Sequence, residues 1–337
     1  MEKVIKTGLL AYGMSGKVFH APFLDAHPGF KLDAILERNQ KKAAIDYPNL
    51  KSFDTIDDLL NDESLELIVI NTPNFTHYDY AKSALQKGKH ILVEKPFTAT
   101  AAQAKELFEL AKQLDKKIFV YHNRRWDSDF NAVIDIIESG VLGKLNEVHI
   151  RYDRYRPAIG PKRFKEEPMP ASGLMYDLGS HLIDQAISLF GKPLSHYKVL
   201  GKNRKETQVD DYFCIHLNYA DSVNVFLHAN MLVAAMEPGF VLHGEKGSFI
   251  KARADTQEGQ LLKNMKPTDS QYGIEEIGSE GVLTLIDEEG NKNTTLITSG
   301  KGRYMELFES IYQSLTHGED FPVKEEQVLW QLEILEA

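Results

Sequence analysis

The stretch GLLAYGMSGKVFHAPF (residues 8–23) contains the turn that decides the fold of the first part of the chain. Its apolar start leads directly into Ala11-Tyr12-Gly13-Met14-Ser15-Gly16, which has G-x-G-x-x-G spacing with alanine in the first position. In such a loop the first glycine makes the tight turn, the second lets the backbone approach a pyrophosphate, and the third permits close helix packing. Ala11 fits the turn if its φ is negative. The stretch therefore predicts a nucleotide-binding loop, although an ordinary strand–turn–helix has the same local pattern.

Short apolar runs alternate with helix-like segments around this loop, up to about residue 123. Several of the runs are apolar at nearly consecutive positions, as in strands buried on both faces of a parallel sheet; they are IKTGLLA (5–11), LDAIL (32–36), LELIVI (65–70), HILVE (90–94) and KIFVYH (117–122). The segments TIDDLL, THYDYAKSALQKG and TAAQAKELFELAKQLDKK carry helix start signals or helical spacing. The alternation predicts right-handed βαβ units, and hence a doubly wound dinucleotide-binding (Rossmann) domain over residues 1–123.

The pattern changes in residues 124–337, which we expect to form an α+β domain. One helix is predicted at FNAVIDIIESGVLG and a buried one at LMYDLGSHLIDQAISLF. The segments EVHIRYDRYR, DYFCIHLNY, SVNVFLHANM and GFVLHGEKGSFI read as strands of a mainly antiparallel sheet. Residues 254–300 are polar and weakly patterned and are predicted to be loops. The helix predicted at 324–337 is a candidate to pack back on the first domain.

Composition limits the classes of protein and partner. The 337 residues carry a net charge of −10, which argues against a nucleic-acid partner. Cys214 is the single cysteine, so the chain has no internal disulfide and a cytoplasmic location is expected. The N-terminus has no apolar signal region, and no apolar stretch is long enough to span a membrane.

The end of the second predicted strand bears on which dinucleotide binds. Glu37 stands about twenty residues after the glycine loop, where an acidic side chain binds the ribose hydroxyls of NAD and repels a 2′-phosphate. Arg38 is adjacent, and Lys41 and Lys42 follow; these cations would accommodate NADP. The balance favours NAD and leaves NADP open.

Three residues have the chemistry expected of a catalytic site. Lys95 follows Glu94 at the end of a strand, and in a doubly wound sheet such ends line the ligand crevice. Asp177 and His181 are four residues apart, so both lie on one face of an otherwise apolar helix. The pair is interpreted either as a buried structural contact or as acid–base machinery. A metal pair is disfavoured, because no third ligand falls at a recognisable spacing.

Further candidates lie where the domains join. Asn123 and Arg124, in YHNRRWDSDF, are expected at the crevice, where they would contact cofactor and substrate. The basic segment RYRPAIGPKRFK either binds an anionic substrate group or forms a solvated strand edge or subunit contact. Two local predictions follow from prolines. The bond before Pro96 is a candidate cis bond. Pro22 should kink or end the first helix near Ala21, which would place Phe19 and His20 beside the crevice.

Taken together, the motifs resemble those of the Gfo/Idh/MocA oxidoreductases along nearly the whole chain. The matching stretches are AYGxxGxxFHAPF, TPNxTH, GKHILVEKP, YHNRRWDSDF and YDLGSHLIDQ, and the fourth is most like the NADP-using scyllo-inositol dehydrogenase branch. The resemblance implies a Rossmann domain, an open-faced C-terminal sheet used in homodimer or tetramer contacts, and a nicotinamide cofactor. It also implies catalytic roles for Lys95, Asp177 and His181. The cofactor-side residues that it implies include the TPNxxH turn, with Thr72, Pro73, Asn74 and His77, and the EKP residue Glu94.

Two departures from the family pattern stand out: Ala11 replaces the first glycine, and Glu37 stands where the NADP-using branch has a small hydroxyl residue. The second departure leaves that branch's cofactor preference open for this chain.

The hypothesis that follows is reversible oxidation of a secondary hydroxyl of a cyclic polyol or sugar. His181 would be the general base, Asp177 would orient its imidazole, and Lys95 would hydrogen-bond the reacting oxygen while hydride passes to nicotinamide. The alternatives are a non-catalytic NAD(P)-binding sensor, a reductase of another carbonyl substrate such as an anhydro-sugar ketone or biliverdin, and an NAD-dependent glycoside hydrolase.

Overall fold

The computed structural model describes residues 3–337 and divides into two compact units. The first unit contains the chain up to Asn123, together with Gln257–Tyr272 and Tyr304–Leu329. The second contains Arg124–Thr256, Gly273–Arg303 and Trp330–Ala337. The chain thus first leaves the first unit at residue 123, and two later segments of the range 124–337 return to it.

The first unit is built on a parallel sheet of six strands in the order β3-β2-β1-β4-β5-β6. This order confirms the predicted doubly wound topology. The strand bounds are β1 Ile5–Leu9, β2 Phe30–Leu36, β3 Lys51–Phe53, β4 Leu67–Ile70, β5 His90–Val93 and β6 Ile118–Val120. Only β3 was not predicted, because this short edge strand is mostly exposed and carries no apolar run.

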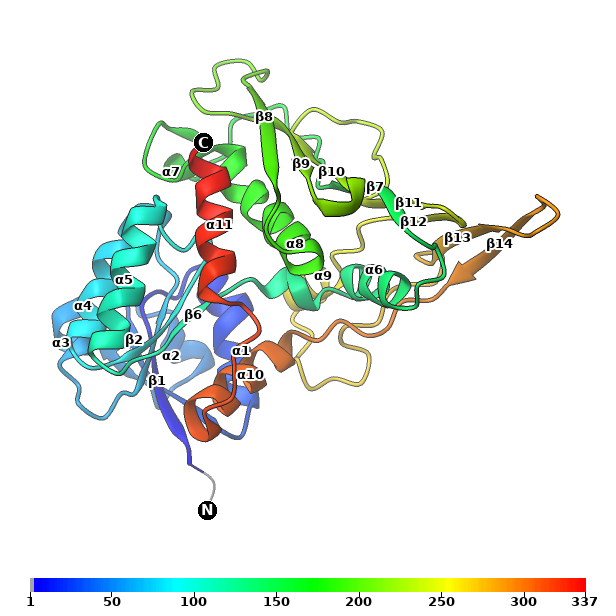
Figure 1. Cartoon of the computed structure of the whole chain (residues 1–337). Helices are drawn as coiled ribbons and strands as arrows, with labels where there is room; N and C mark the ends of the chain where they lie inside the picture. The colour runs from blue at the N-terminus through cyan, green and yellow to red at the C-terminus, as the bar shows by residue number, and fades with distance from the viewer. Residues whose placement is uncertain (1–2) are drawn as a thin grey trace. The chain divides into compact units, whose positions relative to one another are not determined.

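Helices flank this sheet. Two of them begin at threonines that the sequence marks as helix starts: Thr55 and Thr100 cap α3 and α5 by accepting the amide N–H of Asp58 and Gln103. α4 packs against α5, and α1 packs against α10 (Figure 1). The helices are α1 Ala21–Ala26, α2 Ala43–Asp46, α3 Ile56–Leu60, α4 His77–Gln86, α5 Ala101–Gln113, α9 Thr256–Leu262 and α10 Tyr304–His317. The last helix, α11 Glu325–Glu336, begins in the first unit and ends in the second.

The expected irregularity of the first helix near Ala21 is present as a kink, whereas the alternative, that Pro22 ends the helix there, is wrong. A π-helical turn, η1 (Gly16–His20), leads directly into α1, and Pro22 lies in the first turn of α1. A proline is tolerated there because the first amides of a helix have no intrahelical partner. The helical backbone is interrupted at His20 (φ −121°), one residue before Ala21. His20 is fully buried.

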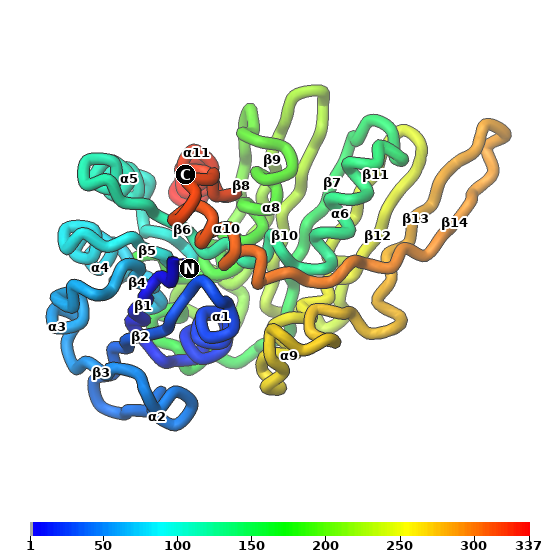
Figure 2. The backbone as a smooth tube through the Cα atoms, turned by 90° about the horizontal axis from the view of Figure 1, so that it is seen from below, coloured from blue at the N-terminus to red at the C-terminus, as the bar shows by residue number. Residues whose placement is uncertain are grey.

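The second unit is built on an eight-stranded sheet in the order β14-β13-β12-β11-β7-β10-β9-β8, and Figure 2 shows the strands side by side. All pairs are antiparallel except β7 and β10, which confirms the mainly antiparallel prediction. The bounds are β7 Leu145–Arg151, β8 Ser195–Gly201, β9 Tyr212–Asn218, β10 Asn224–Asn230, β11 Phe240–Gly244, β12 Gly247–Lys251, β13 Gly281–Ile286 and β14 Lys292–Ile297.

Residues 254–300 are not only loops, which corrects the sequence prediction. They contain α9, and they add β13 and β14 to the edge of the sheet. β14 is exposed at nearly every position, so its sequence lacks the buried alternation by which a strand is predicted.

Helices α6 (Ser128–Glu138) and α8 (Ser180–Phe190) cover one face of the second sheet. Strands β9 and β10 alternate strictly between buried and half-buried side chains. The buried set, including Leu217 and Val225, lies under the helices, and the other set faces away from them. Along residues 3–337, none of the helices is long and apolar enough to cross a membrane.

Candidate cofactor and substrate residues

The glycine loop has the backbone that its spacing predicts. A Cβ on Gly16 would lie 2.1 Å from the carbonyl oxygen of Ala11, so only glycine fits at the third position. A Cβ on Gly13 would meet nothing within 4 Å, which leaves room for a ligand beside the second position. Ala11 is not among the described non-glycine residues with positive φ, so alanine is tolerated at the turn. The loop therefore fits a pyrophosphate in the way expected of this motif.

A largely buried carboxylate, 13% exposed, joins the loop to the end of β5. Glu94 accepts hydrogen bonds from the Ser15 hydroxyl and from Nε2 of His20, the latter over 2.9 Å. Burial raises the pKa of Glu94, but the hydrogen bond and charge of His20, with the Ser15 bond, outweigh it and lower the pKa to about 2. The same carboxylate accepts the amide N–H of Lys95 over 3.3 Å. Glu94 thus positions the glycine loop and the first residue after β5 together.

At the end of β2, Glu37 is bonded to the helix that follows, which the sequence does not indicate. Both carboxylate oxygens of Glu37 accept backbone N–H groups at the start of α2, from Lys42 (2.9 Å) and Ala43 (3.1 Å). Tyr12 of the glycine loop donates its hydroxyl to Asp46 of α2 over 2.8 Å. Burial, together with Asp46, raises the pKa of Tyr12. Glu37 is therefore fixed in place by α2. Arg38 follows it as an exposed residue, and Met14 is exposed at the tip of the loop.

The TPNxxH turn is bonded to the segment that carries Lys95. His77 is fully buried, and its ring nitrogens lie 2.9 Å from the carbonyl oxygen of Thr72 and 2.8 Å from that of Pro96. Burial lowers the pKa of His77, although the two carbonyls oppose the shift. Pro73 and Asn74 lead into a short 3₁₀ turn, η2 (Asn74–Thr76). The bond between Lys95 and Pro96 is cis, as predicted.

In the second unit, Asp177 and His181 lie on consecutive helical turns. Asp177 belongs to a π-helical turn, η4 (Met175–Gly179), which continues into α8 at Ser180, and His181 is the second residue of α8. Insertions of this kind are frequent at functional sites. His181 is buried, whereas Asp177 is partly exposed and forms a 2.5 Å ion pair with Lys165 of α7 (Arg163–Glu166). The structure thus adds a lysine to the predicted pair.

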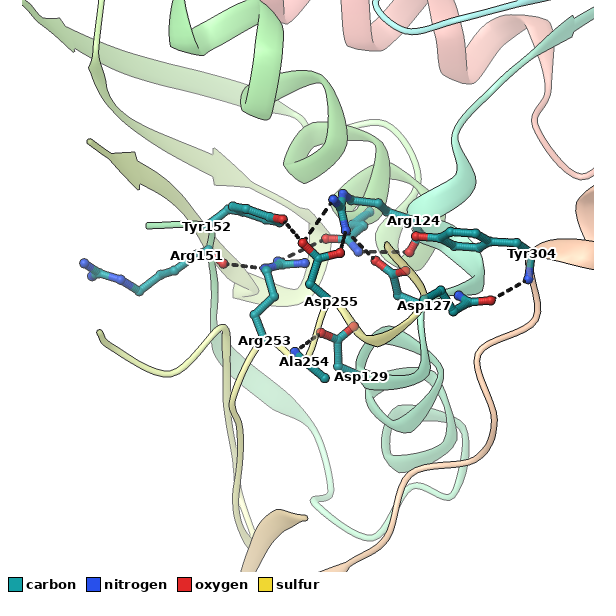
Figure 3. Close-up of polar contacts among 11 residues, drawn as sticks. Arg124, Asp127, Asp129, Arg151, Tyr152, Arg253, Ala254, Asp255 and Tyr304 are labelled. Carbon is teal, nitrogen blue, oxygen red and sulfur yellow. Dashed lines mark hydrogen bonds and ion pairs between the residues drawn. The ribbon is translucent and has the colours of Figure 1, made fainter. Parts of the chain in front are cut away.

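Arg124 lies in a buried network (Figure 3), in which its guanidinium bonds to Asp127 (3.1 Å) and Asp255 (2.8 Å). The ring of Tyr152 packs against both Arg124 and Arg253, at 4.9 and 4.6 Å, and its hydroxyl donates to Asp255 over 2.5 Å. Burial raises the pKa of Asp255, but the charge of Arg124 outweighs it and lowers the pKa. The charge of Arg124 is therefore compensated within the unit. Asn123, at which the chain first leaves the first unit, is buried.

Sequence reasoning missed the residues that hold the predicted ones. Lys165, Asp255 and Asp46 all contact predicted site residues. The basic segment RYRPAIGPKRFK was the one signal that could have pointed to Lys165. Asp255 and Asp46 belong to no sequence motif that would have identified them as partners of site residues. Within residues 3–337, the structure groups no three His, Cys, Asp or Glu side chains that could hold a metal ion.

Comparisons with known proteins agree with this arrangement. The model of the Gfo/Idh/MocA oxidoreductase family, NAD-binding Rossmann fold, matches residues 5–122, and that of its C-terminal α/β domain matches residues 134–337. Oxidoreductase YdgJ of Escherichia coli is 39% identical over 100% of this chain and 96% of its own length. The scyllo-inositol 2-dehydrogenase (NADP(+)) IolW of Bacillus subtilis is 35% identical over 99% and 92%, respectively. A solved structure from Bacteroides fragilis, 41% identical, superimposes with a TM-score of 0.90 over 99% of this chain and 96% of that one.

Proposed function

Because the chain belongs to the Gfo/Idh/MocA family of NAD(P)-binding oxidoreductases, we propose that it reversibly oxidises a secondary hydroxyl of a cyclic polyol or sugar. The observation that carries the proposal is the Asp177–His181 pair. These two ionisable side chains are four residues apart, with Asp177 within a π-helical turn and the buried imidazole of His181 in the helix that follows it. A relative 35% identical over nearly the whole chain is named as an inositol dehydrogenase, which supports this substrate class.

The first unit would hold the dinucleotide. Gly13 and Ser15 would offer backbone N–H groups to the pyrophosphate, since a side chain at Gly13 is absent and the space beside it is open. Glu37 would bind the adenosine ribose, and the turn from Thr72 to Asn74 would line the nicotinamide side. When bound, the nicotinamide accepts a hydride from the carbinol carbon or returns it to a ketone.

The residues of the chain would handle the proton. His181 would remove the hydroxyl proton as the carbon is oxidised, and its imidazole suits this role because its ordinary pKa lies near neutrality. Asp177 would orient the imidazole and stabilise its charged form. Lys95 would donate a hydrogen bond to the same oxygen and stabilise its developing negative charge. Asn123 would bind the substrate, and Arg124 would hold the segment that carries Asn123.

The acidic side chain of Glu37 at the end of β2 favours NAD over NADP as the cofactor. The carboxylate of Glu37 is fixed by the amides of Lys42 and Ala43, so it would have to move away to admit a 2′-phosphate. The name of the relative IolW specifies NADP(+), which makes the cofactor a point to test.

A panel of inositol isomers and hexoses, each with NAD and with NADP, tests the proposal through the absorbance of reduced nicotinamide. We expect turnover of at least one cyclic polyol or sugar. Nucleotide binding without turnover of any panel member would contradict it and favour the non-catalytic sensor. Release of free sugar from a glycoside without net reduction would favour the hydrolase.

We also propose that two copies of the chain pair through the uncovered face of the second sheet. One row of partners crosses this face from edge to edge through Tyr197, His216, Phe226, His149, Val241, Ile250, Val282 and Leu296. The rings of His216 and His149 both stack on Phe226, with centroids 4.5 and 5.1 Å apart. Such a continuous aromatic and aliphatic row is typical of an association surface. Phe226→Glu should give a monomer by light scattering, and an unchanged assembly would contradict the proposal.

A further inference from the structure

The ion pair between Lys165 and Asp177 differs from an incidental surface contact, because both side chains are carried by anchored elements. Lys165 Nζ lies 2.5 Å from Oδ1 of Asp177, and the two side chains are 31% and 17% exposed. Most ion pairs between mobile surface side chains contribute little to stability. Here both partners are presented by elements that buried charges hold in place.

The element that carries Lys165 is fixed by its neighbour. Glu166 accepts a 2.7 Å bond from the guanidinium of Arg204 and a 2.9 Å bond from the amide of Gly160. Arg204 is bonded in turn to Asp211, and these two side chains are only 3% and 1% exposed. α7 is therefore anchored without help from Lys165.

The element that carries Asp177 is fixed by the residue before Asp211. Asp210 accepts the amide N–H of Met175, the first residue of η4, over 2.6 Å. Gly173 approaches so closely that a Cβ there would lie 2.1 Å from Oδ1 of Asp210, and its φ is +87°. Adjacent residues, Asp210 and Asp211, thus anchor the two elements whose side chains form the pair.

The bonds that anchor these two elements do not need the Lys165–Asp177 contact, and Lys165 and Asp177 are more exposed than Glu166, Arg204 and Asp211. An ammonium group has three N–H donors, and Lys165 uses one of them on Asp177. A carboxylate offers about four acceptor positions. A hydroxyl placed beside the pair can donate to Asp177 and accept from Lys165 at the same time.

We propose that Lys165 is a substrate-binding residue: with Asp177 it binds a hydroxyl next to the reacting carbon, and so selects polyols that carry a vicinal diol. The proposal rests on the proposed function and names the substrate feature that this function requires. It assigns to the basic segment RYRPAIGPKRFK a role in recognising a neutral hydroxyl, with Lys165 as the contacting residue.

The test compares Lys165→Met, Lys165→Arg and the control Arg163→Met. Arg163 lies on the same short helix, its side chain is 82% exposed, and it pairs with Glu167, so its loss removes a charge without touching Asp177. For the polyol or sugar that the wild type oxidises best, Lys165→Met should raise KM about 10- to 100-fold, as expected for loss of a hydrogen bond from a charged donor. The value of kcat, the dissociation constant of reduced nicotinamide dinucleotide measured by fluorescence, and Tm should stay near wild type. Lys165→Arg should recover most of the loss, and Arg163→Met should show none.

A substrate change provides the second arm. For the monodeoxy analogue that lacks the bound hydroxyl, wild type and Lys165→Met should have equal kcat/KM, because the group that Lys165 contacts is missing. An unchanged KM in Lys165→Met, or an equal penalty on every monodeoxy analogue, would overturn the inference while leaving the proposed function intact. Absence of turnover by the wild type would overturn the proposed function, and this inference with it.

Discussion

Nε2 of His20 lies 2.9 Å from Oε1 of Glu94, so the π-helical turn after the glycine loop is joined to the end of β5. Glu94 also accepts the Ser15 hydroxyl and precedes Lys95. One largely buried carboxylate therefore fixes the loop proposed to bind pyrophosphate and the residue proposed to contact the substrate oxygen.

His20→Ala should weaken dinucleotide binding by about tenfold, because the loop loses one of its two bonds to Glu94 and a buried charge loses a partner. Fluorescence titration with reduced dinucleotide measures this. His27→Ala is the matched control, since His27 is also a buried histidine of the first unit beside a carboxylate, 2.8 Å from Glu309. Equal affinities for the two variants would show that the His20 contact does not support the loop.

Glu94→Gln should flatten the acid side of the stability profile. The folded-state pKa of Glu94, about 2, lies below the ordinary value of 4.5, so its ionised form stabilises the fold above about pH 4.5, and this stability is lost as pH falls toward 2. The shift corresponds to about 3 kcal/mol. Urea unfolding from pH 6 to pH 3 should show a steeper fall in the free energy of unfolding for the wild type than for Glu94→Gln. If the free energies of unfolding of the two proteins fell in parallel with pH, the lowered pKa of Glu94 would be contradicted.

Substitutions of Gly16 and Gly13 should have different effects, the first on stability and the second on dinucleotide affinity. Gly16→Ala forces a Cβ to within 2.1 Å of the Ala11 carbonyl oxygen and should reduce the free energy of unfolding by about 3 kcal/mol. Gly13→Ala meets nothing and should leave Tm unchanged, while dinucleotide affinity falls about tenfold or more because the methyl group occupies the ligand's space. Calorimetry and fluorescence titration separate the effects; a Gly13→Ala variant with normal affinity would place the ligand elsewhere.

Arg124→Met should destabilise the second unit by about 3–5 kcal/mol, because it leaves Asp127 and Asp255 without the guanidinium that compensates them. Chemical denaturation measures the loss, with Arg163→Met as the exposed control. A variant of normal stability would show that these carboxylates do not depend on Arg124.

Glu37→Gln separates the charge at the end of β2 from its structural role. The amide oxygen can still accept a backbone N–H from Lys42 or Ala43, so α2 should keep its position. The ratio of kcat/KM for NADP to that for NAD should rise about tenfold once the negative charge is gone. No change in the ratio would show that Glu37 only supports α2.

Much of the fold was predictable because buried parallel strands such as β4 and β5 are continuous apolar runs in the sequence. The strands that were missed, β3, β8, β13 and β14, are short or alternate weakly, since solvent reaches one or both of their faces. Local spacing located Asp177 with His181, because helical neighbours are four residues apart. The carboxylate that compensates Arg124, in contrast, was not predictable. Arg124 meets Asp255 across 131 residues, and no local pattern marks such a pair.

The most direct test of the central claim is the turnover of Lys95→Met and His181→Asn on the polyol or sugar that the wild type oxidises best. The account predicts that kcat falls about 10²- to 10⁴-fold in each variant, as for loss of a general base or of its electrostatic partner, while the dissociation constant of the reduced dinucleotide stays within about twofold of wild type. Near-normal kcat in both variants would contradict it.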